Sequence, residues 1–205
     1  MTQLLDTLDI WTETLDTGGG VDAIYMDYMK AFDRVRHRRL VGKVEAFGIK
    51  GNVLQWIQDF LSQRSQRVCI NGVKSEKGEV TSGIPQGSVI GPMLFIMYIN
   101  DLPLHVQSHV KLFADDTKIF TRNDDTAAME TLQDDLDRLH EWSTNWQMRF
   151  HPEKCSVMRM GKPRSDRKYH MRGQDAQGLQ TIVELAESEE EKDLGVLIDK
   201  GLTFK

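Results

Sequence analysis

The fold is decided by the stretch Val110-Lys111-Leu112-Phe113-Ala114-Asp115-Asp116-Thr117-Lys118-Ile119-Phe120, in which two acids interrupt two short apolar segments. The segments 110–114 and 117–120 are rich in apolar and β-branched residues, and the pattern predicts two strands joined as a hairpin. An Asp-Asp pair in a turn is usually solvated. Here the flanking strands are expected to be buried, so the pair is predicted to stand at the tip of buried structure.

A second acid stands at the end of another expected strand. Residues 21–27, Val-Asp-Ala-Ile-Tyr-Met-Asp, form a short apolar run that ends at Asp27. A lone Asp after a strand is most often a turn or cap residue. If the hairpin of Asp115 and Asp116 lies beside this strand, however, three carboxylates converge, and their repulsion is costly unless a cation neutralises it. Oxygen ligands favour Mg²⁺ or Mn²⁺, and two such ions can activate a 3′-hydroxyl and stabilise a leaving pyrophosphate.

The rest of the chain alternates between helical and extended patterns. Helices are predicted at 2–15, 40–47, 52–61, 93–99 and 125–146, from apolar residues at three- and four-residue spacing. Asn71-Gly72 predicts the turn of a hairpin over 67–73, and 82–91 is expected to be a loop. A last strand is predicted at 194–198, after a basic segment at 162–172 and an acidic one at 187–191. The pattern favours an α+β fold over a doubly wound parallel sheet.

Composition sets further bounds. The chain has 205 residues, 40% of them hydrophobic, with a net charge of −5, so we do not expect its whole surface to attract nucleic acid. A local basic groove remains compatible with this charge. No apolar run spans a membrane and no signal peptide is recognised, so the expected location is the nucleus or cytoplasm, away from membranes. The two cysteines are expected to be reduced thiols, and no histidine pairs with them at zinc-finger spacing.

Five segments, taken in order, resemble the motifs of reverse transcriptases encoded by non-LTR (LINE-type) retrotransposons. They are Tyr25-Met26-Asp27-Tyr28-Met29-Lys30-Ala31-Phe32-Asp33, Ser82-Gly83-Ile84-Pro85-Gln86-Gly87-Ser88-Val89-Ile90-Gly91-Pro92, Phe113-Ala114-Asp115-Asp116, Met148 to Cys155, and Asp193-Leu194-Gly195-Val196-Leu197-Ile198-Asp199. The series covers roughly residues 20 to 200. The resemblance implies an RNA-directed DNA polymerase that adds dNTPs to a DNA primer on an RNA template during retrotransposition.

The resemblance also implies roles for single residues. The expected catalytic residues are Asp27, Asp115, Asp116 and Lys154, and the expected ligands of two Mg²⁺ or Mn²⁺ ions are the three acids and the backbone carbonyl of Tyr28. The expected nucleotide-binding residues are Phe32, Pro85, Gln86 and Gly87, and the expected primer-grip residues are Leu194, Gly195 and Val196. Phe32 would exclude a 2′-hydroxyl, although a core aromatic is the alternative. Lys154 would neutralise the pyrophosphate, although a surface lysine is equally compatible with the pattern.

The family resemblance implies a polymerase palm, a ferredoxin-like antiparallel sheet with helices on one face. Three segments are expected: an N-terminal helix and linker at 1–20, the palm at 21–161, and a connector with a primer-grip-like hairpin at 162–205 that leads to a truncated thumb. Fingers are expected to be mostly missing, because only 26 residues precede Asp27, and the thumb absent or incomplete.

Two alternatives and one further expectation accompany this prediction. The chain could be a catalytically inactive retrotransposon relic that at most binds nucleic acid or protein. An RNA-templated RNA polymerase would share the acids, but Phe32 favours deoxynucleotides. The basic residues Arg34, Arg36, Arg38, Arg39 and Lys43 could contact phosphate or form a solvated helix face. Self-association is expected if palm surface is exposed.

Overall fold

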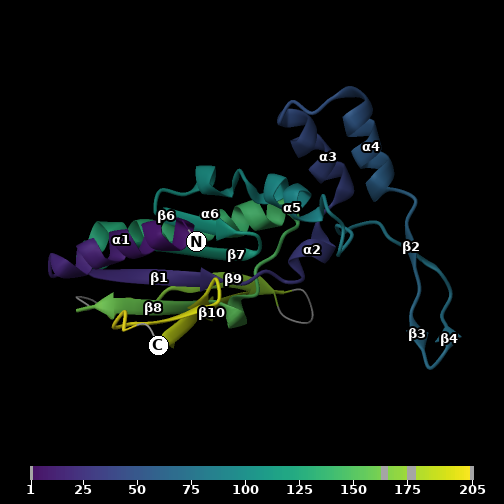
Figure 1. The fold of residues 1–205 in the computed structure, drawn as a ribbon. Helices are drawn as coiled ribbons and strands as arrows, with labels where there is room; N and C mark the ends of the chain where they lie inside the picture. The colour runs from purple at the N-terminus through teal and green to yellow at the C-terminus, as the bar shows by residue number, and fades with distance from the viewer. Residues whose placement is uncertain (1, 163–165, 175–178, 204–205) are drawn as a thin grey trace. The chain divides into compact units, whose positions relative to one another are not determined.

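The computed structural model describes residues 2–162, 166–174 and 179–203. By their contacts, these residues form two compact units (Figure 1). The first comprises residues up to Tyr28, Leu102–Thr144 and the chain from Arg149 onward; the second comprises Met29–Asp101 and Asn145–Met148. Among the described helices, none is long and apolar enough to cross a membrane.

The first unit is built on a five-stranded sheet in the order β11-β8-β1-β7-β6. Its strands are β1 (Gly20–Met26), β6 (His109–Phe113), β7 (Asp116–Arg122), β8 (Ser156–Gly161) and β11 (Ala186–Ser188). The pairs β1–β7, β1–β8 and β6–β7 are antiparallel, and β11 joins β8 in parallel. The predicted α+β class with an antiparallel sheet is confirmed. β1 has the central position because six of its seven residues are buried.

Helix α1 (Thr2–Asp16) packs on the face of the sheet that carries Val21 and Ala23. Its Trp11 is fully buried and meets the Phe120 ring edge-on, with 5.5 Å between ring centroids. Of the apolar residues that predict this helix, Leu5 is exposed, and the others pack in this core: Leu4, Leu8, Trp11 and Leu15. The opposite face, to which Ile24 of β1 contributes, is buried as well.

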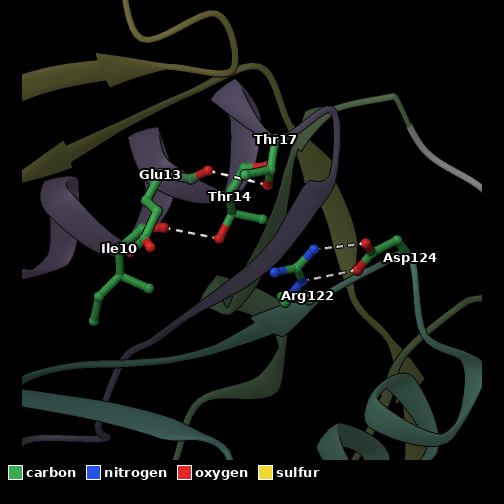
Figure 2. A network of polar contacts seen from close by, with 6 residues as sticks. All are labelled: Ile10, Glu13, Thr14, Thr17, Arg122 and Asp124. Carbon is green, nitrogen blue, oxygen red and sulfur yellow. Dashed lines mark hydrogen bonds and ion pairs between the residues drawn. The ribbon is translucent and has the colours of Figure 1, made fainter.

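The C-terminal end of α1 is closed by threonine hydroxyls (Figure 2). Thr14 Oγ1 donates to the Ile10 carbonyl at 2.8 Å, and Thr17 Oγ1 donates to the Glu13 carbonyl at 3.1 Å. The Glu13 carbonyl also accepts the Thr17 amide at 3.2 Å, so the hydroxyls add to the backbone hydrogen bonds of the last turn. Gly18 then adopts a φ of 77°, a left-handed conformation that favours glycine, and the chain turns into β1.

The remaining elements of the first unit complete the layers around the sheet. They are α6 (Thr126–Trp146, whose last two residues belong to the second unit), the 3₁₀ turns η1 (Leu102–His105) and η2 (Pro152–Lys154), the hairpin of β9 (His170–Gln174) with β10 (Gln180–Glu184), and the hairpin of β12 (Glu190–Asp193) with β13 (Val196–Asp199). Strands β8, β9, β10 and β11 were not predicted. The predicted strand at 194–198 begins two residues later, because Leu194 and Gly195 form the turn.

A buried polar network explains why Asp22 can stand inside an apolar strand. Its two carboxylate oxygens accept hydrogen bonds from Asn123 Nδ2 and from the Tyr169 hydroxyl, each at 2.8 Å. All three side chains are buried. Tyr169 immediately precedes β9, so the network fastens the segment that the sequence pattern left unassigned.

The second unit is helical with a thin β ribbon. It contains α2 (Ala31–Arg34), α3 (His37–Ala46), α4 (Gly51–Leu61), α5 (Gly91–Ile99) and the short strands β2 (Ser65–Gln66), β3 (Cys69–Ile70), β4 (Val73–Lys74) and β5 (Gly78–Glu79). The Asn71-Gly72 turn joins β3 to β4 as predicted, since Ile70 pairs with Val73. The three segments at 1–20, 21–161 and 162–205 stay a prediction.

Candidate active site

Two of the predicted catalytic acids are brought together by the register of the sheet. β1 and β7 run antiparallel with Met26 opposite Thr117, so the residue after Met26 lies beside the residue before Thr117. These two residues are Asp27 and Asp116. Their side chains, with Lys154, line a cavity of about 160 Å³ within the first unit.

The third acid, Asp115, lies in the tight turn between β6 and β7. Phe113 pairs with Asp116, which leaves Ala114 and Asp115 as the two turn residues. Ala114 adopts a φ of 50°, a left-handed conformation that is uncommon for alanine and is imposed here by the paired strands on both sides. Asp115 is exposed at the tip, as the sequence pattern predicts.

The charges of the neighbouring acids affect the protonation of Asp116. Partial burial raises the pKa of Asp116 above its usual value. The charges of Asp115, Asp193 and Asp27 raise it further, against the opposing effect of Lys118. Lys154 Nζ lies 3.6 Å from Asp27 Oδ2, but both side chains are about half exposed or more. Solvent screens such a pair, so Lys154 is free to exchange partners at little cost.

The backbone of Asp27 is fixed on both sides by the segment that resembles the fourth motif. The amide of Asp27 contacts Cys155 Sγ at 3.5 Å, and its carbonyl accepts a hydrogen bond of 2.8 Å from the amide of His151. Burial raises the pKa of the Cys155 thiol to about 12, so the sulfur stays a neutral packing group. The motif resemblance covered Cys155 and His151, but neither side-chain chemistry nor spacing indicated that they hold Asp27.

Tyr28 is anchored beside Asp27. Its ring stacks on Phe150 with 4.5 Å between centroids, and its hydroxyl accepts a hydrogen bond from Thr117 Oγ1 at 3.4 Å. Burial raises the pKa of this phenol, which therefore stays protonated. An isolated β-bridge pairs Tyr28 with Phe150. The position of the predicted carbonyl ligand is thus set by a buried, stacked side chain.

The site offers the oxygen ligands that a hard divalent cation needs. The pKa of Asp116 is raised first by partial burial and then by three neighbouring acids, Asp115, Asp193 and Asp27, whose charges a cation would offset. Among the residues that the structure describes, no three His, Cys, Asp or Glu side chains are gathered closely enough to form a finished metal cage. Exposed carboxylates that repel one another are expected to close only around a cation.

The predicted nucleotide-binding residues belong to the second unit and are joined to one another there. Phe32 stacks on Phe95 with 4.4 Å between centroids. The Phe32 carbonyl accepts a hydrogen bond of 2.9 Å from the amide of Ile84, and Gln86 Nε2 contacts Asp33 Oδ1 at 3.3 Å. Phe32 and the loop of Pro85, Gln86 and Gly87 therefore form one local structure.

Two further details of that unit were not foreseen. His37 Nε2 lies 2.8 Å from the Gly83 carbonyl, which ties the loop to α3. Lys43, expected in a basic cluster, is buried: it pairs with Asp101 at 2.5 Å and lies 3.6 Å from the centroid of the Trp146 ring. Lys43 is therefore not available to a phosphate.

The predicted primer-grip residues form the turn of the β12–β13 hairpin in the first unit. Leu194 and Gly195 have φ values of 50° and 86°, and Val196 begins β13. Leu194 lines the same cavity as Asp27 and Asp116. The structure thus brings one predicted primer-grip residue to the cavity that two of the predicted catalytic acids line.

The comparisons with known proteins agree with this architecture. The family model described as reverse transcriptase (RNA-dependent DNA polymerase) matches residues 9–197. The RNA-directed DNA polymerase from the mobile element jockey of Drosophila melanogaster is 33% identical over 141 residues, which are 64% of this chain and 15% of that protein. Its counterpart from Drosophila funebris is 27% identical over 212 residues, 99% of this chain and 22% of that protein. The chain thus spans about a fifth of the length of these relatives.

A solved structure supports the fold independently. Telomerase from Candida albicans, in complex with a fragment of telomeric RNA, superimposes with a TM-score of 0.66 over 100% of this chain and 33% of that one, at 11% identity. This likeness concerns the fold alone and is consistent with a polymerase palm. Together with the family match, it confirms the resemblance drawn from the five motifs. The chain belongs to the reverse transcriptase family, and its curated relatives are the polymerases of non-LTR retrotransposons.

Proposed function

We propose that this chain carries RNA-directed DNA polymerase activity, in which dNTPs are added to the 3′-hydroxyl of a DNA primer on an RNA template. The observation that carries the proposal is the register of β1 and β7, which sets Asp27 beside Asp116 at the edge of a cavity, with Asp115 in the adjoining turn. Family membership supports the same chemistry.

Enzymes of this family generally use divalent metal ions. In this chain, Asp27 and Asp115 would hold two Mg²⁺ or Mn²⁺ ions, with Asp116 and the Tyr28 carbonyl in support. When bound, such ions would activate the primer hydroxyl and neutralise charge on the leaving pyrophosphate. The charges of Asp115 and Asp27 add to the effect of partial burial in raising the pKa of Asp116, and they support this assignment because a cation would offset them.

Lys154 is the proposed partner of the departing pyrophosphate. Its ammonium lies 3.6 Å from Asp27 and is 64% exposed, so it can leave that carboxylate for a phosphate without a large desolvation cost. Lysine binds phosphate as a point charge that can donate a proton or a hydrogen bond. Lys154 ends η2, just before β8, on a backbone that also holds Asp27.

Phe32 is the proposed selector for deoxynucleotides, with Pro85, Gln86 and Gly87 as the adjoining nucleotide-binding loop. We expect Phe32→Val to lower discrimination against ribonucleotides by about tenfold or more, because the stacked ring would no longer exclude a 2′-hydroxyl. The measurement is the ratio of kcat/KM for a dNTP and its matching rNTP. Phe47→Val, at a half-exposed phenyl ring of the same unit, is the control. An unchanged ratio in Phe32→Val would leave Phe32 as a core aromatic.

Primer extension tests the proposed function itself. Extension of oligo(dT) on poly(rA) should require Mg²⁺ or Mn²⁺ and dTTP. If folded protein binds the primer–template but never extends it, the second candidate function holds instead, a relic that only binds nucleic acid.

Self-association is a further proposal about partners. The β ribbon of the second unit carries Val68, Ile70 and Val73 with 61%, 66% and 75% of their surfaces exposed, and its strands are only two residues long. Exposed apolar side chains on a thin ribbon favour contact with a second copy of the chain. We expect light scattering to report dimers or larger species at micromolar concentration, and fewer of them in the Ile70→Lys variant. A monodisperse monomer would contradict the proposal.

A further inference from the structure

A polar row crosses three strands of the sheet of the first unit. Tyr25 of β1 pairs with Ser156 of β8 on one side and with Lys118 of β7 on the other. Directly opposed residues of antiparallel strands project from the same face, so these three side chains form one row, which we call the polar row. The row adjoins the apolar part of this face, since Ala23 and Phe120, two positions away, belong to the core around Trp11.

Strand β12 is held at both ends of the polar row. Lys118 forms an ion pair with Asp193 in which the two side chains are only 5% and 6% exposed. At the other end, Ser156 Oγ donates a hydrogen bond to the Glu191 carboxylate. Glu191 and Asp193 are two residues apart and therefore project from the same side of β12. The strand thus contacts β8 through one side chain and β7 through the next.

The middle of the row supports the same arrangement. The Tyr25 hydroxyl is buried and has no hydrogen-bond partner among the described residues. Tyr25, Glu191 and Asp193 line one cavity, so both acids of β12 lie near the phenol. Two acids of β12 that face this row, each bonded to a different member of it, define a single register for the strand. A shift by one residue would turn both acids away from the sheet.

The polar row lies next to the catalytic residues. Its members Tyr25, Lys118 and Ser156 are each two positions away in sequence from Asp27, Asp116 and Lys154 respectively. The turn residue Leu194 follows Asp193 directly and lines the cavity of Asp27 and Asp116. The contacts that hold β12 therefore also fix where the hairpin turn stands relative to the catalytic acids.

Stability alone does not account for a buried ion pair at this place. Taking two charges out of water largely cancels their attraction, and an apolar pair of similar size is often as stable. A buried pair does fix one arrangement, because either charge without its partner is costly. We therefore expect the buried Lys118–Asp193 pair to fix the register of β12 on the sheet.

We propose that the polar row is the binding position, or seat, of strand β12 on the sheet. The ion pair of Lys118 with Asp193 would position the β12–β13 turn for the primer end. The hydrogen bond from Ser156 to Glu191 would support it. The inference rests on the proposed function, because the turn acts on a primer only in a polymerase. Ile198 of β13 is buried in the core around Trp11, so it holds the hairpin on the sheet without fixing its register.

Hydrogen–deuterium exchange tests the seat without any need for catalysis. In Lys118→Met we expect amides of 190–199 to exchange at least about tenfold faster than in the natural chain, because β12 loses its anchor. The charge-swapped chain, Lys118→Asp with Asp193→Lys, should regain most of the protection. Lys111→Met is the matched control: Lys111 lies opposite Lys118 on β6, but its ion pair is with exposed Asp6 of α1. Unchanged protection of 190–199 in Lys118→Met would overturn the proposal.

Kinetics test what the seat is for. Lys118→Met should raise KM for primer–template about tenfold, with a smaller change in kcat among molecules shown by titration to be active. Ser156→Ala removes only the hydrogen bond to Glu191, so the chain should still fold. We expect this variant to raise KM for primer–template by about threefold. A role in folding alone would lower the active fraction and leave KM unchanged, and that outcome would overturn the positioning role. If the natural chain extends no primer, the proposed function fails, while hydrogen exchange still decides whether the seat exists.

Discussion

Replacing Asp115 and Asp116 together by asparagine should lower the rate of primer extension by about 10³-fold or more, without unfolding the chain. The metal ions that these carboxylates would hold supply several kcal/mol of transition-state stabilisation, and each 1.36 kcal/mol is a factor of ten in rate. Folding should survive because both side chains are exposed and asparagine has the same shape and suits a tight turn.

The effect on stability should run opposite to the effect on rate. Because the pKa of Asp116 is raised, the folded chain binds this proton more tightly than the unfolded chain, and the charged carboxylate lowers stability at pH values above that pKa. The double variant should therefore melt at the same temperature as the natural chain, or slightly above it, in EDTA at neutral pH. Adding Mg²⁺ or Mn²⁺ should raise the melting temperature of the natural chain only.

Extension and melting, measured side by side, give this prediction two independent readouts. Asp134→Asn is the matched control, because Asp134 is an exposed acid on α6 of the same unit. It should extend primers and respond to Mg²⁺ as the natural chain does. Extension by the double variant within tenfold of the natural rate would remove Asp115 and Asp116 from the chemistry. An equal melting shift with Mg²⁺ in both proteins would place the bound cation elsewhere.

The sequence predicts local structure well where the decisive signal is local. The spacing of Leu4, Leu8 and Trp11 predicts α1, and the Asn71-Gly72 pair predicts the β3–β4 turn. The paired acids between apolar segments predict a hairpin with Asp115 at its tip, which the structure has. In each case the residues that carry the pattern are within a few positions of one another, so periodicity or turn chemistry suffices.

Other features depend on partners that are distant in sequence. Tyr169 bonds to Asp22, 147 positions away, and without that partner the basic segment 162–172, which includes the start of β9, gives no strand pattern. Lys118 and Asp193 are separated by 75 positions, and neither side chain alone predicts an ion pair. The turn at Leu194 was missed for a different reason. Leucine rarely adopts a positive φ, so the strand was predicted to begin two residues early.

Truncation of Trp11 to alanine is expected to cost about 3–5 kcal/mol in the free energy of unfolding, which is the usual cost of removing a large aromatic side chain from a core. Trp11 is fully buried among Val21, Met158 and Met160, where collapse of the surrounding strands cannot fill the space. The melting temperature should fall by about 10 °C or more for a chain of this length. Urea denaturation followed by circular dichroism gives the free energy directly.

Trp56→Ala and Trp11→Phe sharpen the interpretation of that experiment. Trp56 is 54% exposed on α4, so its removal should cost less than about 1 kcal/mol. Trp11 Nε1 is buried without a hydrogen-bond partner among the described residues, which carries a desolvation cost of about 1–3 kcal/mol. Phenylalanine removes that N–H and keeps an aromatic ring, so Trp11→Phe should lose much less stability than Trp11→Ala. Equal losses in Trp11→Ala and Trp56→Ala would mean that α1 is not part of the core of the sheet, and the face that seats β12 would then lack its apolar support.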